Sequence, residues 1–521
     1  MNVAELILSR GQDAAVALLH RETVVTYGEL RDAVARIAGG LLARGRRRSD
    51  RVGVFSENNP FFAKTYLGIL HAGLTAVPLQ TDLTAEAFAR TVADAGLNDV
   101  FVSNRFLNRL RPWAGKLGLT LFPESQEMCR VGGPLPPPAA RAAADLASLM
   151  FTSGSTGSPK GVMVTHRNIE CNSRDIIAYL GLQPDDRVMA VLPFHYCFGL
   201  SLLHTHLMAG GSVVLNNEFK LFPESVLVEM QRKECTGFAG VPSTYQILLR
   251  NSRFRQMTFP KLRWFQQAGG RLPNACIQEL REAFPTVRFF LMYGQTEGTA
   301  RLSYLPPERL ADKPGSIGRG LPTTKLEVLR TDGTPVAPGS DEIGEIVASG
   351  GNIAPGYWND PVETGRFFRN GRLHTGDLAR VDSEGFIFIV EREREMIKTG
   401  GNRVSAKEVE DVIAELPEVV EAAVVGAPHE LLGEAIKALV VPAGDAGLAA
   451  RDVLAHCHRR LPSFKVPEEV IFVRCLPHNS SGKILKAKLK EMIVRLRTAQ
   501  FSREDGAAGR HLHVVAQPCL A

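Results

Sequence analysis

Short apolar runs alternate with segments of helical apolar spacing through most of the chain, and this alternation constrains the fold more than any other feature. Residues 51–55 and 76–79 are apolar enough to be buried strands, and residues 61–72 between them repeat apolar side chains at helical intervals. Similar strand-like runs recur at 188–192, 212–215, 237–240 and 288–293. A strand, a helix and a second strand form a βαβ unit, so the sequence predicts a layered α/β fold.

The last quarter of the chain carries a different pattern, which predicts a second folding unit. After Gly385, residues 386–390 are strand-like and are followed by charges of both signs. Ser405 and Glu408 have the spacing of a capping box and predict the start of a helix. Two further strands and a helix are expected at 422–425, 438–441 and 453–460. Together these elements indicate a compact α+β unit of about 100 residues.

The length of the chain and a stretch rich in glycine and proline indicate more than one domain. The chain has 521 residues, and domains commonly have about 100 to 200 residues. The stretch 132–138 is rich in glycine and proline, which cannot continue a helix or a central strand, and it is expected to be a linker. Beyond Leu496 the sequence becomes polar and rich in glycine and alanine, so residues 497–521 are expected to form a flexible tail.

Charge and targeting signals narrow the class of protein. The net charge of +6 is small for this length, and the arginine cluster at 44–48 is short, so we expect a solvated surface and no nucleic-acid partner. The N-terminus lacks the pattern of a secretory signal, and no apolar run reaches the roughly 18 residues of a transmembrane segment. The eight cysteines are widely spaced, which favours reduced thiols over a zinc site. These features indicate a cytoplasmic protein.

The segment Phe151–Gly161 is the most informative run in the chain. It contains Thr152, Ser153, Gly154, Ser155, Thr156, Gly157 and Lys160. Small residues let backbone N–H groups approach an anion, hydroxyls add donors, and a lysine adds countercharge, so the run predicts a phosphate-binding loop. It is not a Walker A loop, because Gly161 stands where serine or threonine would follow the lysine. By composition alone, a flexible Ser/Gly linker is an equally good interpretation.

The order of these residues resembles the phosphate loop of the ANL superfamily of adenylate-forming enzymes. That superfamily includes acyl-CoA and aryl-CoA synthetases, luciferases and adenylation domains, and the chain is most similar to AMP-forming acyl-CoA synthetases. The resemblance implies a large N-terminal α/β domain with several sheets, residues 1–392, and a small mobile α+β domain, residues 393–496. It places the hinge near Arg394, where the family commonly has aspartate or lysine.

Further motifs extend the resemblance and assign roles to residues of the large domain. By that resemblance, Tyr293 of the run Tyr293-Gly294-Gln295-Thr296-Glu297 lies on adenine, Thr296 contacts phosphate, and Glu297 holds Mg²⁺ together with Thr156. The motif ending at Asp377 would bind the ribose hydroxyls with support from Arg392. Gly269, Gly270 and Arg271 would flank adenine and the acyl group, although many members have a small residue in place of Arg271.

The resemblance also assigns residues of the small domain. Lys483 in the run Asn479–Ile484 would be the lysine that catalyses adenylation. A positioned ammonium stabilises the charge that builds as a carboxylate attacks the α-phosphate. Lys398, Gly400 and Gly401 would line the thiol tunnel after the small domain rotates.

The segment Leu192–Leu200 corresponds to the mouth of the family's acyl pocket. Either His195 or Tyr196 occupies the position that gates thiol access, because both alignments are possible. No acidic residue lies between Asp186 and Glu218 to pair with a substrate ammonium, which favours an acid without an α-amino group. Candidate pocket residues, each of which could equally be plain core, are Tyr245, Gln267, Met292 and Ala300.

The sequence thus predicts a ligase that uses ATP and Mg²⁺ to adenylate a carboxylic acid, a fatty or aryl acid, and transfers the acyl group to coenzyme A. One alternative acceptor is the phosphopantetheine arm of an acyl carrier protein. A catalytically inactive nucleotide-binding scaffold is a third hypothesis, disfavoured by the presence of both Glu297 and Lys483. Light emission, as in luciferases, is a fourth and would need a special substrate.

Overall fold

The computed structural model describes most of the chain. The described residues are 2–48, 50–126, 136–152, 160–392, 396–429, 431–444, 447–478, 484–486 and 488–493, without the side chains of Glu391, Arg392 and Arg403. Residues 127–135 and 497–521 lie outside them, so the linker is described only over its last three residues and the tail stays a prediction.

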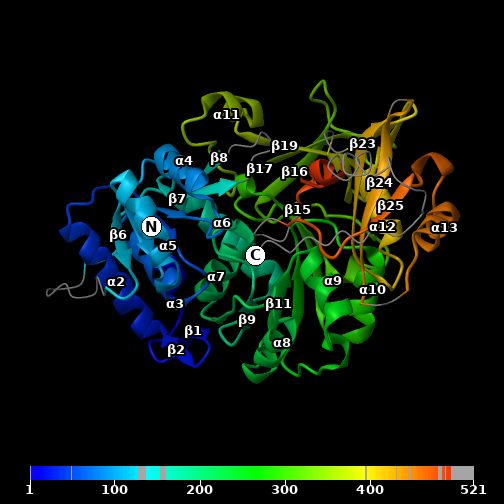
Figure 1. Ribbon diagram of the computed structural model, residues 1–521. Helices are drawn as coiled ribbons and strands as arrows, with labels where there is room; N and C mark the ends of the chain where they lie inside the picture. Colours follow the sequence, from blue (N-terminus) through cyan, green and yellow to red (C-terminus); the bar gives the residue numbers. More distant parts are fainter. Residues whose placement is uncertain are drawn as a thin grey trace.

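A six-stranded sheet forms one end of the molecule (Figure 1). Its spatial order is β6-β5-β3-β4-β7-β8, with all neighbours parallel except β7 and β8. Its strands are β3 (Arg51–Phe55), β4 (Thr75–Pro78), β5 (Asp99–Val102), β6 (Thr120–Pro123), β7 (Leu146–Thr152) and β8 (Lys160–Thr165). The associated helices are α2 (Tyr27–Ala43), α3 (Pro60–His71), α4 (Ala85–Ala95) and α5 (Asn104–Leu117). Thus β3, α3 and β4 form the predicted βαβ unit.

An eight-stranded sheet lies beside it, in the order β14-β13-β12-β11-β9-β10-β1-β2. Its strands are β1 (Val16–His20), β2 (Thr23–Thr26), β9 (Arg187–Ala190), β10 (Ser212–Leu215), β11 (Gly237–Gly240), β12 (Trp264–Gln267), β13 (Arg288–Tyr293) and β14 (Ser303–Leu305). Only the two edge strands, β2 and β14, are antiparallel. Its helices are α6 (His166–Leu180), α7 (Cys197–Ala209), α8 (Pro223–Arg232), α9 (Pro242–Asn251) and α10 (Asn274–Ala283).

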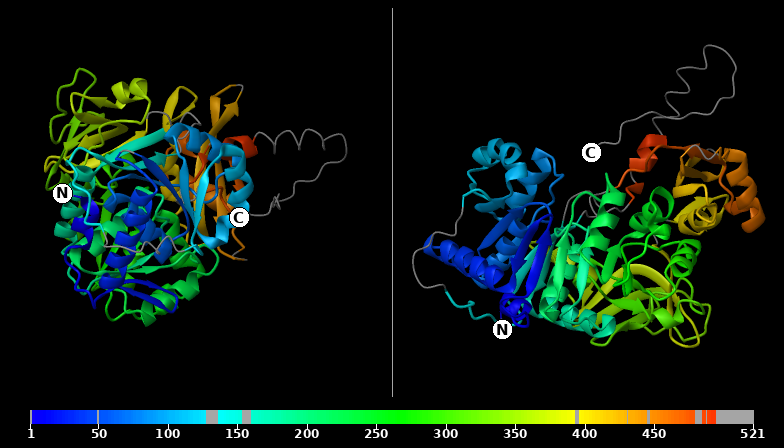
Figure 2. Two further views of the ribbon diagram at one scale, coloured as in Figure 1. Left: turned by 90° about the vertical axis from the view of Figure 1, so that its left-hand side faces the viewer. Right: turned by 90° about the horizontal axis from the view of Figure 1, so that it is seen from below.

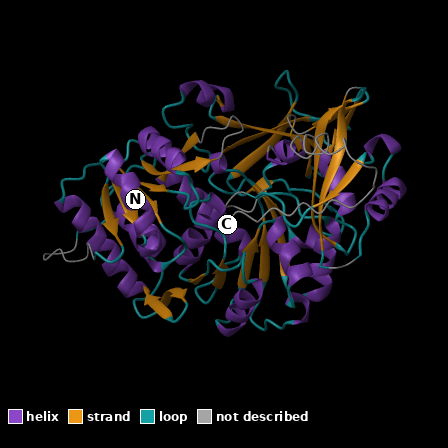
Figure 3. Ribbon diagram, in the orientation of Figure 1, coloured by secondary structure: helices purple, strands orange, loops and turns teal. Residues whose placement is uncertain are grey.

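Two further sheets complete the molecule, and Figure 3 shows their strands above and beside the helical layers. The third sheet contains β15 (Gly320–Leu321), β16 (Thr324–Leu329), β17 (Gly344–Gly350), β18 (Phe368–Arg369), β19 (Arg372–Val381) and β20 (Ile387–Arg392), with α11 (Pro361–Phe367) beside it. The fourth contains β21 (Met396–Thr399), β22 (Asn402–Ser405), β23 (Val419–His429), β24 (Gly433–Pro442) and β25 (Glu469–Phe472), with α12 (Ala406–Ile413) and α13 (Ala450–Arg460). This C-terminal unit lies at the opposite end from β3–β6 (Figures 1 and 2).

Helix starts follow the local sequence. Thr26 and Glu29 form a reciprocal capping box at α2, and Asn59 caps α3 with Pro60 at its first position. At α12 only half of the predicted box forms. The Ser405 side chain accepts from the backbone N–H of Glu408, but the Glu408 carboxylate accepts from Lys465 Nζ at 2.7 Å. A tertiary ion pair has taken the place of the local bond.

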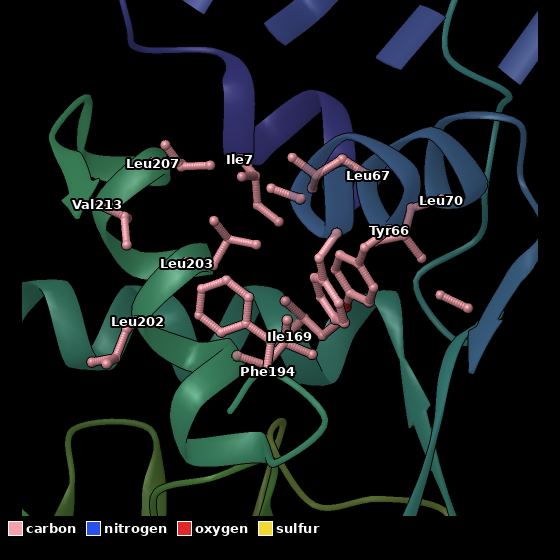
Figure 4. Packing of buried hydrophobic residues seen from close by; sticks show 14 of the residues in the cluster. Ile7, Tyr66, Leu67, Leu70, Ile169, Phe194, Leu202, Leu203, Leu207 and Val213 are labelled. Carbon is pink, nitrogen blue, oxygen red and sulfur yellow. The ribbon is translucent and has the colours of Figure 1, made fainter. Parts of the chain in front are cut away.

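The largest core fills the space between the two parallel sheets, and we call it the inter-sheet core. Figure 4 shows Ile7 of α1 (Val3–Leu8), Tyr66 of α3, Ile169 of α6 and Leu203 of α7 converging there. A separate outer core packs the opposite face of the eight-stranded sheet against α8, α9 and α10 and includes Phe265. Successive residues of β12 therefore pack in different cores. Trp264 packs in the inter-sheet core, and Phe265 packs in the outer core.

Four buried histidines couple the stability of this fold to pH. Burial lowers the pKa of His166, His195 and His206 to about 4 and that of His204 to about 3. The ordinary histidine pKa is about 6.5, so between pH 6.5 and 4 the unfolded chain binds more protons than the folded one. We expect the free energy of unfolding to fall as pH drops through this window, by up to about 1.4 kcal/mol per pH unit for each histidine.

The expectation is checked by following the thermal midpoint between pH 7 and 4.5. His204→Gln, which removes a ring whose Nε2 lies 3.1 Å from the Tyr66 hydroxyl, should flatten the decline. His458→Gln, at an exposed position of α13, is the control and should leave the slope unchanged. A midpoint that stays constant over this range would contradict the assignment.

No helix in the described ranges combines the length and apolar character needed to cross a bilayer. No disulfide joins the cysteines of the described ranges, Cys171, Cys197, Cys235, Cys276, Cys457 and Cys475. The predicted fold class, a large α/β unit with several sheets and a small α+β unit, is confirmed.

Candidate active site

The predicted phosphate loop joins two neighbouring antiparallel strands. Thr152 ends β7 and lies directly opposite Lys160, the first residue of β8. The Lys160 ammonium forms an ion pair with Glu363 of α11, lies 5.5 Å from the ring centre of Tyr357, and holds the pKa of the Glu363 carboxyl below its usual range. Ser153, Gly154, Ser155, Thr156 and Gly157 lie outside the described residues, so their roles stay predictions.

Tyr357 connects Lys160 to Glu297. The Tyr357 hydroxyl donates a hydrogen bond of 2.7 Å to Glu297 Oε1, while its ring faces the Lys160 ammonium. Burial and the nearby Glu297 carboxylate raise the pKa of Tyr357, so the phenol stays neutral and acts as a donor. The residues predicted to bind phosphate and Mg²⁺ therefore lie on two sides of one buried tyrosine.

The end of β13 brings a second pair of predicted residues together. The Tyr293 hydroxyl donates a 2.6 Å hydrogen bond to Oδ2 of Asp377, which is only 3% exposed on β19. Gly294 follows Tyr293, and a Cβ there would lie 2.0 Å from the carbonyl oxygen of Ala300, so this turn requires glycine. The contact joins the eight-stranded sheet to the third sheet. Asp377 is also the register partner of Arg392 across β19 and β20, although the Arg392 side chain is not described.

The strip after β12 has the conformation that its glycines allow. Gly269 has a φ of +87°, which favours glycine, and the Gln267 amide donates to the carbonyl of Gly270 at 2.7 Å. Arg271 forms an ion pair of 3.2 Å with Asp411 of α12. Arg271, the residue that departs from the family pattern, thus contacts the C-terminal unit in this arrangement.

The predicted mouth of the acyl pocket lies against the Thr296 motif. Cys197 Sγ, at the start of α7, is 3.4 Å from Thr296 Oγ1. Its neighbour His195 is 4% exposed, and its pKa of about 4 keeps the imidazole neutral at pH 7. Tyr196 accepts a hydrogen bond from Gln80 at 3.3 Å. Both His195 and Tyr196 remain candidates for gating thiol access.

The small-domain residues are positioned by a tight hairpin. Thr399 and Asn402 pair across β21 and β22, and Gly400 and Gly401 make the two-residue turn with positive φ values. The Lys398 backbone N–H donates to Glu434 of β24. Within the described ranges, no recorded contact joins this hairpin to Glu297 or Asp377. Lys483 and the hinge residue Arg394 lie outside the described residues, so their roles stay predictions. The nucleotide contact of Gln295 and the tunnel roles of Lys398, Gly400 and Gly401 also stay predictions.

Sequence reasoning missed Tyr357 and Glu363 and left Tyr245 open between a pocket and a core position. Tyr357 and Glu363 are distant in sequence from Lys160 and Glu297, so no local spacing could reveal them. Tyr245 was a candidate pocket residue, but it packs in the outer core against Phe265 and donates to the Gln266 carbonyl at 2.8 Å. It is therefore a core residue on the face of the sheet opposite Met292.

Tyr357→Phe should test the link between Lys160 and Glu297. The change removes only the hydroxyl that holds Glu297, and a hydrogen bond to a charged group contributes about 1.5–3 kcal/mol. We expect about a 10-fold fall in kcat/KM for ATP and a higher requirement for Mg²⁺, with a thermal midpoint lowered by only a few degrees. An unaltered Mg²⁺ dependence would show that Tyr357 does not position Glu297.

Known proteins with this architecture match nearly the whole chain. The family model described as AMP-binding enzyme matches residues 9–358, and that of its C-terminal domain matches 408–483. A feruloyl-CoA synthase of Amycolatopsis sp is 34% identical over 478 residues, which are 91% of this chain and 95% of the relative.

Solved structures are also similar to nearly the whole chain. The anthranilate CoA ligase AuaEII in complex with anthranoyl-AMP has a TM-score of 0.88 and 26% identity, covering 96% of this chain and 98% of that one. ATP-bound MatB from Rhodopseudomonas palustris has a TM-score of 0.84 and 29% identity, with coverages of 95% and 99%. Taken with the site geometry, these matches establish that the chain belongs to the AMP-binding enzyme family of adenylate-forming enzymes.

Proposed function

We propose that the protein is an AMP-forming acid–CoA ligase that activates a carboxylic acid with ATP. The proposal depends on how the structure brings the predicted nucleotide-binding residues together. Lys160 and Glu297 both contact Tyr357. Tyr293, which begins the motif that contains Glu297, donates a hydrogen bond to Asp377 on the neighbouring sheet. The relatives named as CoA ligases, a feruloyl-CoA synthase and an anthranilate CoA ligase, support coenzyme A as the acceptor.

The proposed reaction has two half-reactions. In the first, a carboxylate oxygen of the acid attacks the α-phosphate of ATP, the α–β phosphoanhydride bond breaks, and pyrophosphate leaves. In the second, the thiol of coenzyme A attacks the acyl carbon and AMP leaves. The small domain, residues 393–496, would turn near Arg394 between the two steps, because Lys483 and the Lys398 hairpin serve different half-reactions.

The chain's residues divide these tasks. Asp377 would accept hydrogen bonds from the ribose hydroxyls, with Tyr293 both bonded to Asp377 and stacked on adenine. Lys160 and the loop that precedes it would hold the triphosphate. Either His195 or Tyr196 would gate access of the thiol, and since His195 is neutral at pH 7, neither would place a cation beside the acyl carbonyl.

Glu297 fits the role of a Mg²⁺ ligand. Its carboxylate accepts a hydrogen bond from Tyr357, and in the described part of the chain no lysine, arginine or histidine pairs with it, so its negative charge is available to a cation. The described residues form no cluster of three metal-binding side chains, so phosphate oxygens would have to complete the shell. Mg²⁺ bound by Glu297 and Thr156 would neutralise charge on the phosphates of ATP.

Acid-dependent exchange of labelled pyrophosphate into ATP tests the first half-reaction. A broad panel of acids without α-amino groups should include active substrates, and the inactive-scaffold hypothesis requires that none be active. Formation of acyl-CoA from free coenzyme A, compared with acylation of a phosphopantetheinylated carrier protein, tests the second. Faster acylation of the carrier protein would replace coenzyme A as the acceptor.

A further inference from the structure

Arg301 is a buried cation close to the motif that is predicted to bind phosphate and Mg²⁺. It follows Thr299 and Ala300, whose positive φ values turn the chain back toward β14, and its side chain is fully buried. The guanidinium carbon lies 4.0 Å from the ring centre of Phe198 on α7. A side chain five residues after Thr296 thus reaches the helix that also carries Cys197.

Among the described residues, the partners of the guanidinium are neutral, and they include the Tyr179 hydroxyl. Its Nε donates to Met292 Sδ at 3.1 Å and its Nη1 to the Ala300 carbonyl at 3.4 Å, both weak interactions. Nη2 is buried with no hydrogen-bond partner, and no carboxylate within the described ranges forms an ion pair with Arg301. Cys197 does not supply the charge, because burial raises the pKa of its thiol. Burying an unpaired charge is costly, so this environment favours an anionic partner for the guanidinium.

Other unsatisfied polar atoms gather on the same side of the eight-stranded sheet. Gln266 is two residues after Trp264 and therefore faces the inter-sheet core, where neither its amide nitrogen nor its oxygen has a partner. Asn172 Nδ2 donates to the Arg301 carbonyl at 2.8 Å, and Asn172 Oδ1 is unpartnered. Native proteins rarely leave such atoms unpaired, and a polar ligand group would satisfy them.

The position of Arg301 relates it to the acyl group. Cys197 contacts Thr296, and the next residue, Phe198, places its ring over the guanidinium. A small cavity adjoins Cys197 and Thr299; its lining includes Asn172, Ser201 and His204 together with apolar side chains, and Arg301 lies outside it. An acid whose reacting carboxylate lies near Thr296 would have to extend past Cys197 and Phe198 for its far end to reach Arg301.

We propose that the acid has a second carboxylate, which pairs with Arg301, while the first is adenylated. The substrate class is thus a dicarboxylic acid, and Arg301 is the residue that selects it. This inference rests on the proposed acid–CoA ligase activity. The second carboxylate takes no part in bond making or breaking and remains on the acyl-CoA product.

Matched pairs of acids test the inference in the pyrophosphate-exchange assay. Each pair differs by one carboxylate, such as hexanedioic acid with hexanoic acid and benzene-1,4-dicarboxylic acid with 4-methylbenzoic acid. We expect the diacid to have a kcat/KM about 10-fold or more above its partner in at least one pair, as expected for a charged hydrogen bond. A preference for the monoacid in every pair would overturn the inference while leaving the ligase function intact.

Variants then assign the preference to the side chain. Arg301→Met removes the charge at similar size and should abolish the diacid preference with an unchanged KM for ATP, whereas Arg301→Lys should retain part of it. Arg288→Met, at an exposed arginine that begins β13, is the matched control and should behave as wild type. A diacid preference that survives Arg301→Met contradicts the assignment. If Arg301→Met does not fold, the wild-type comparison still decides between diacid and monoacid. No exchange with any acid would reject the proposed function itself.

Discussion

Lys483→Ala is expected to lower acyl-adenylate formation by about 100-fold or more and to leave thiol transfer from supplied acyl-AMP nearly unchanged. The reason is that the ammonium stabilises negative charge that develops only as the carboxylate attacks the α-phosphate. Loss of one such preorganised donor costs about 2.7–4 kcal/mol of transition-state stabilisation. In the second half-reaction the leaving AMP also gains negative charge, but the small domain would by then have turned, so this lysine is not expected to stabilise that charge.

The two steps are measured separately, by pyrophosphate exchange for the first and by acyl-CoA formation from synthetic acyl-AMP for the second. Lys488→Ala is the matched control, because Lys488 is exposed and only five residues away. It should retain wild-type rates in both assays. Equal losses in both steps for Lys483→Ala would show that this lysine has a general structural role.

Asp377→Ala is expected to raise the KM for ATP by about 100-fold. Two hydrogen bonds between its carboxylate and the ribose hydroxyls would be lost, each contributing about 1.5–3 kcal/mol, and part of this loss would be recovered through water. The effect should fall mainly on KM, because the ribose is remote from the bonds that change. An unchanged dependence on ATP concentration would remove the ribose assignment.

Two further variants isolate this effect. Asp377 also accepts a hydrogen bond from Tyr293, so Tyr293→Phe, which keeps the ring and removes only the hydroxyl, measures the contribution of that contact. We expect it to change the KM for ATP by less than about 10-fold, the scale of one hydrogen bond between side chains. Asp332→Asn, in an exposed turn where the carboxylate bonds only to Thr334 among the described residues, controls for the loss of a charge.

The individual elements follow closely from the sequence. Periodicity alone located the strand 51–55 and the following helix, because the spacing of apolar residues is a local property of any segment that packs on one face. The motif residues were recognised through their order along the chain, and the structure brings Tyr293 to Asp377 across 84 positions. Ser405 was correctly placed as a helix cap.

Other features depend on contacts between distant segments. Glu408 leaves its capping box because Lys465 offers a charged partner 57 residues away. Tyr245 resembled a pocket residue because it follows β11 closely, yet the side of the sheet that it faces is set by how α9 packs. Sequence spacing carries no information about such choices, since competing partners become available only after the layers assemble.

The sequence by itself determined the α/β class and the order of the adenylate-forming motifs, because these are properties of short segments. Only the tertiary structure decided that Tyr357 holds Glu297 beside Lys160, and that Arg301 is buried against Phe198 with no ion pair to another described residue. The physical reason is that burial and charge pairing depend on which segments meet in space. A side chain's sequence neighbours therefore do not fix the cost of leaving its charge unpaired.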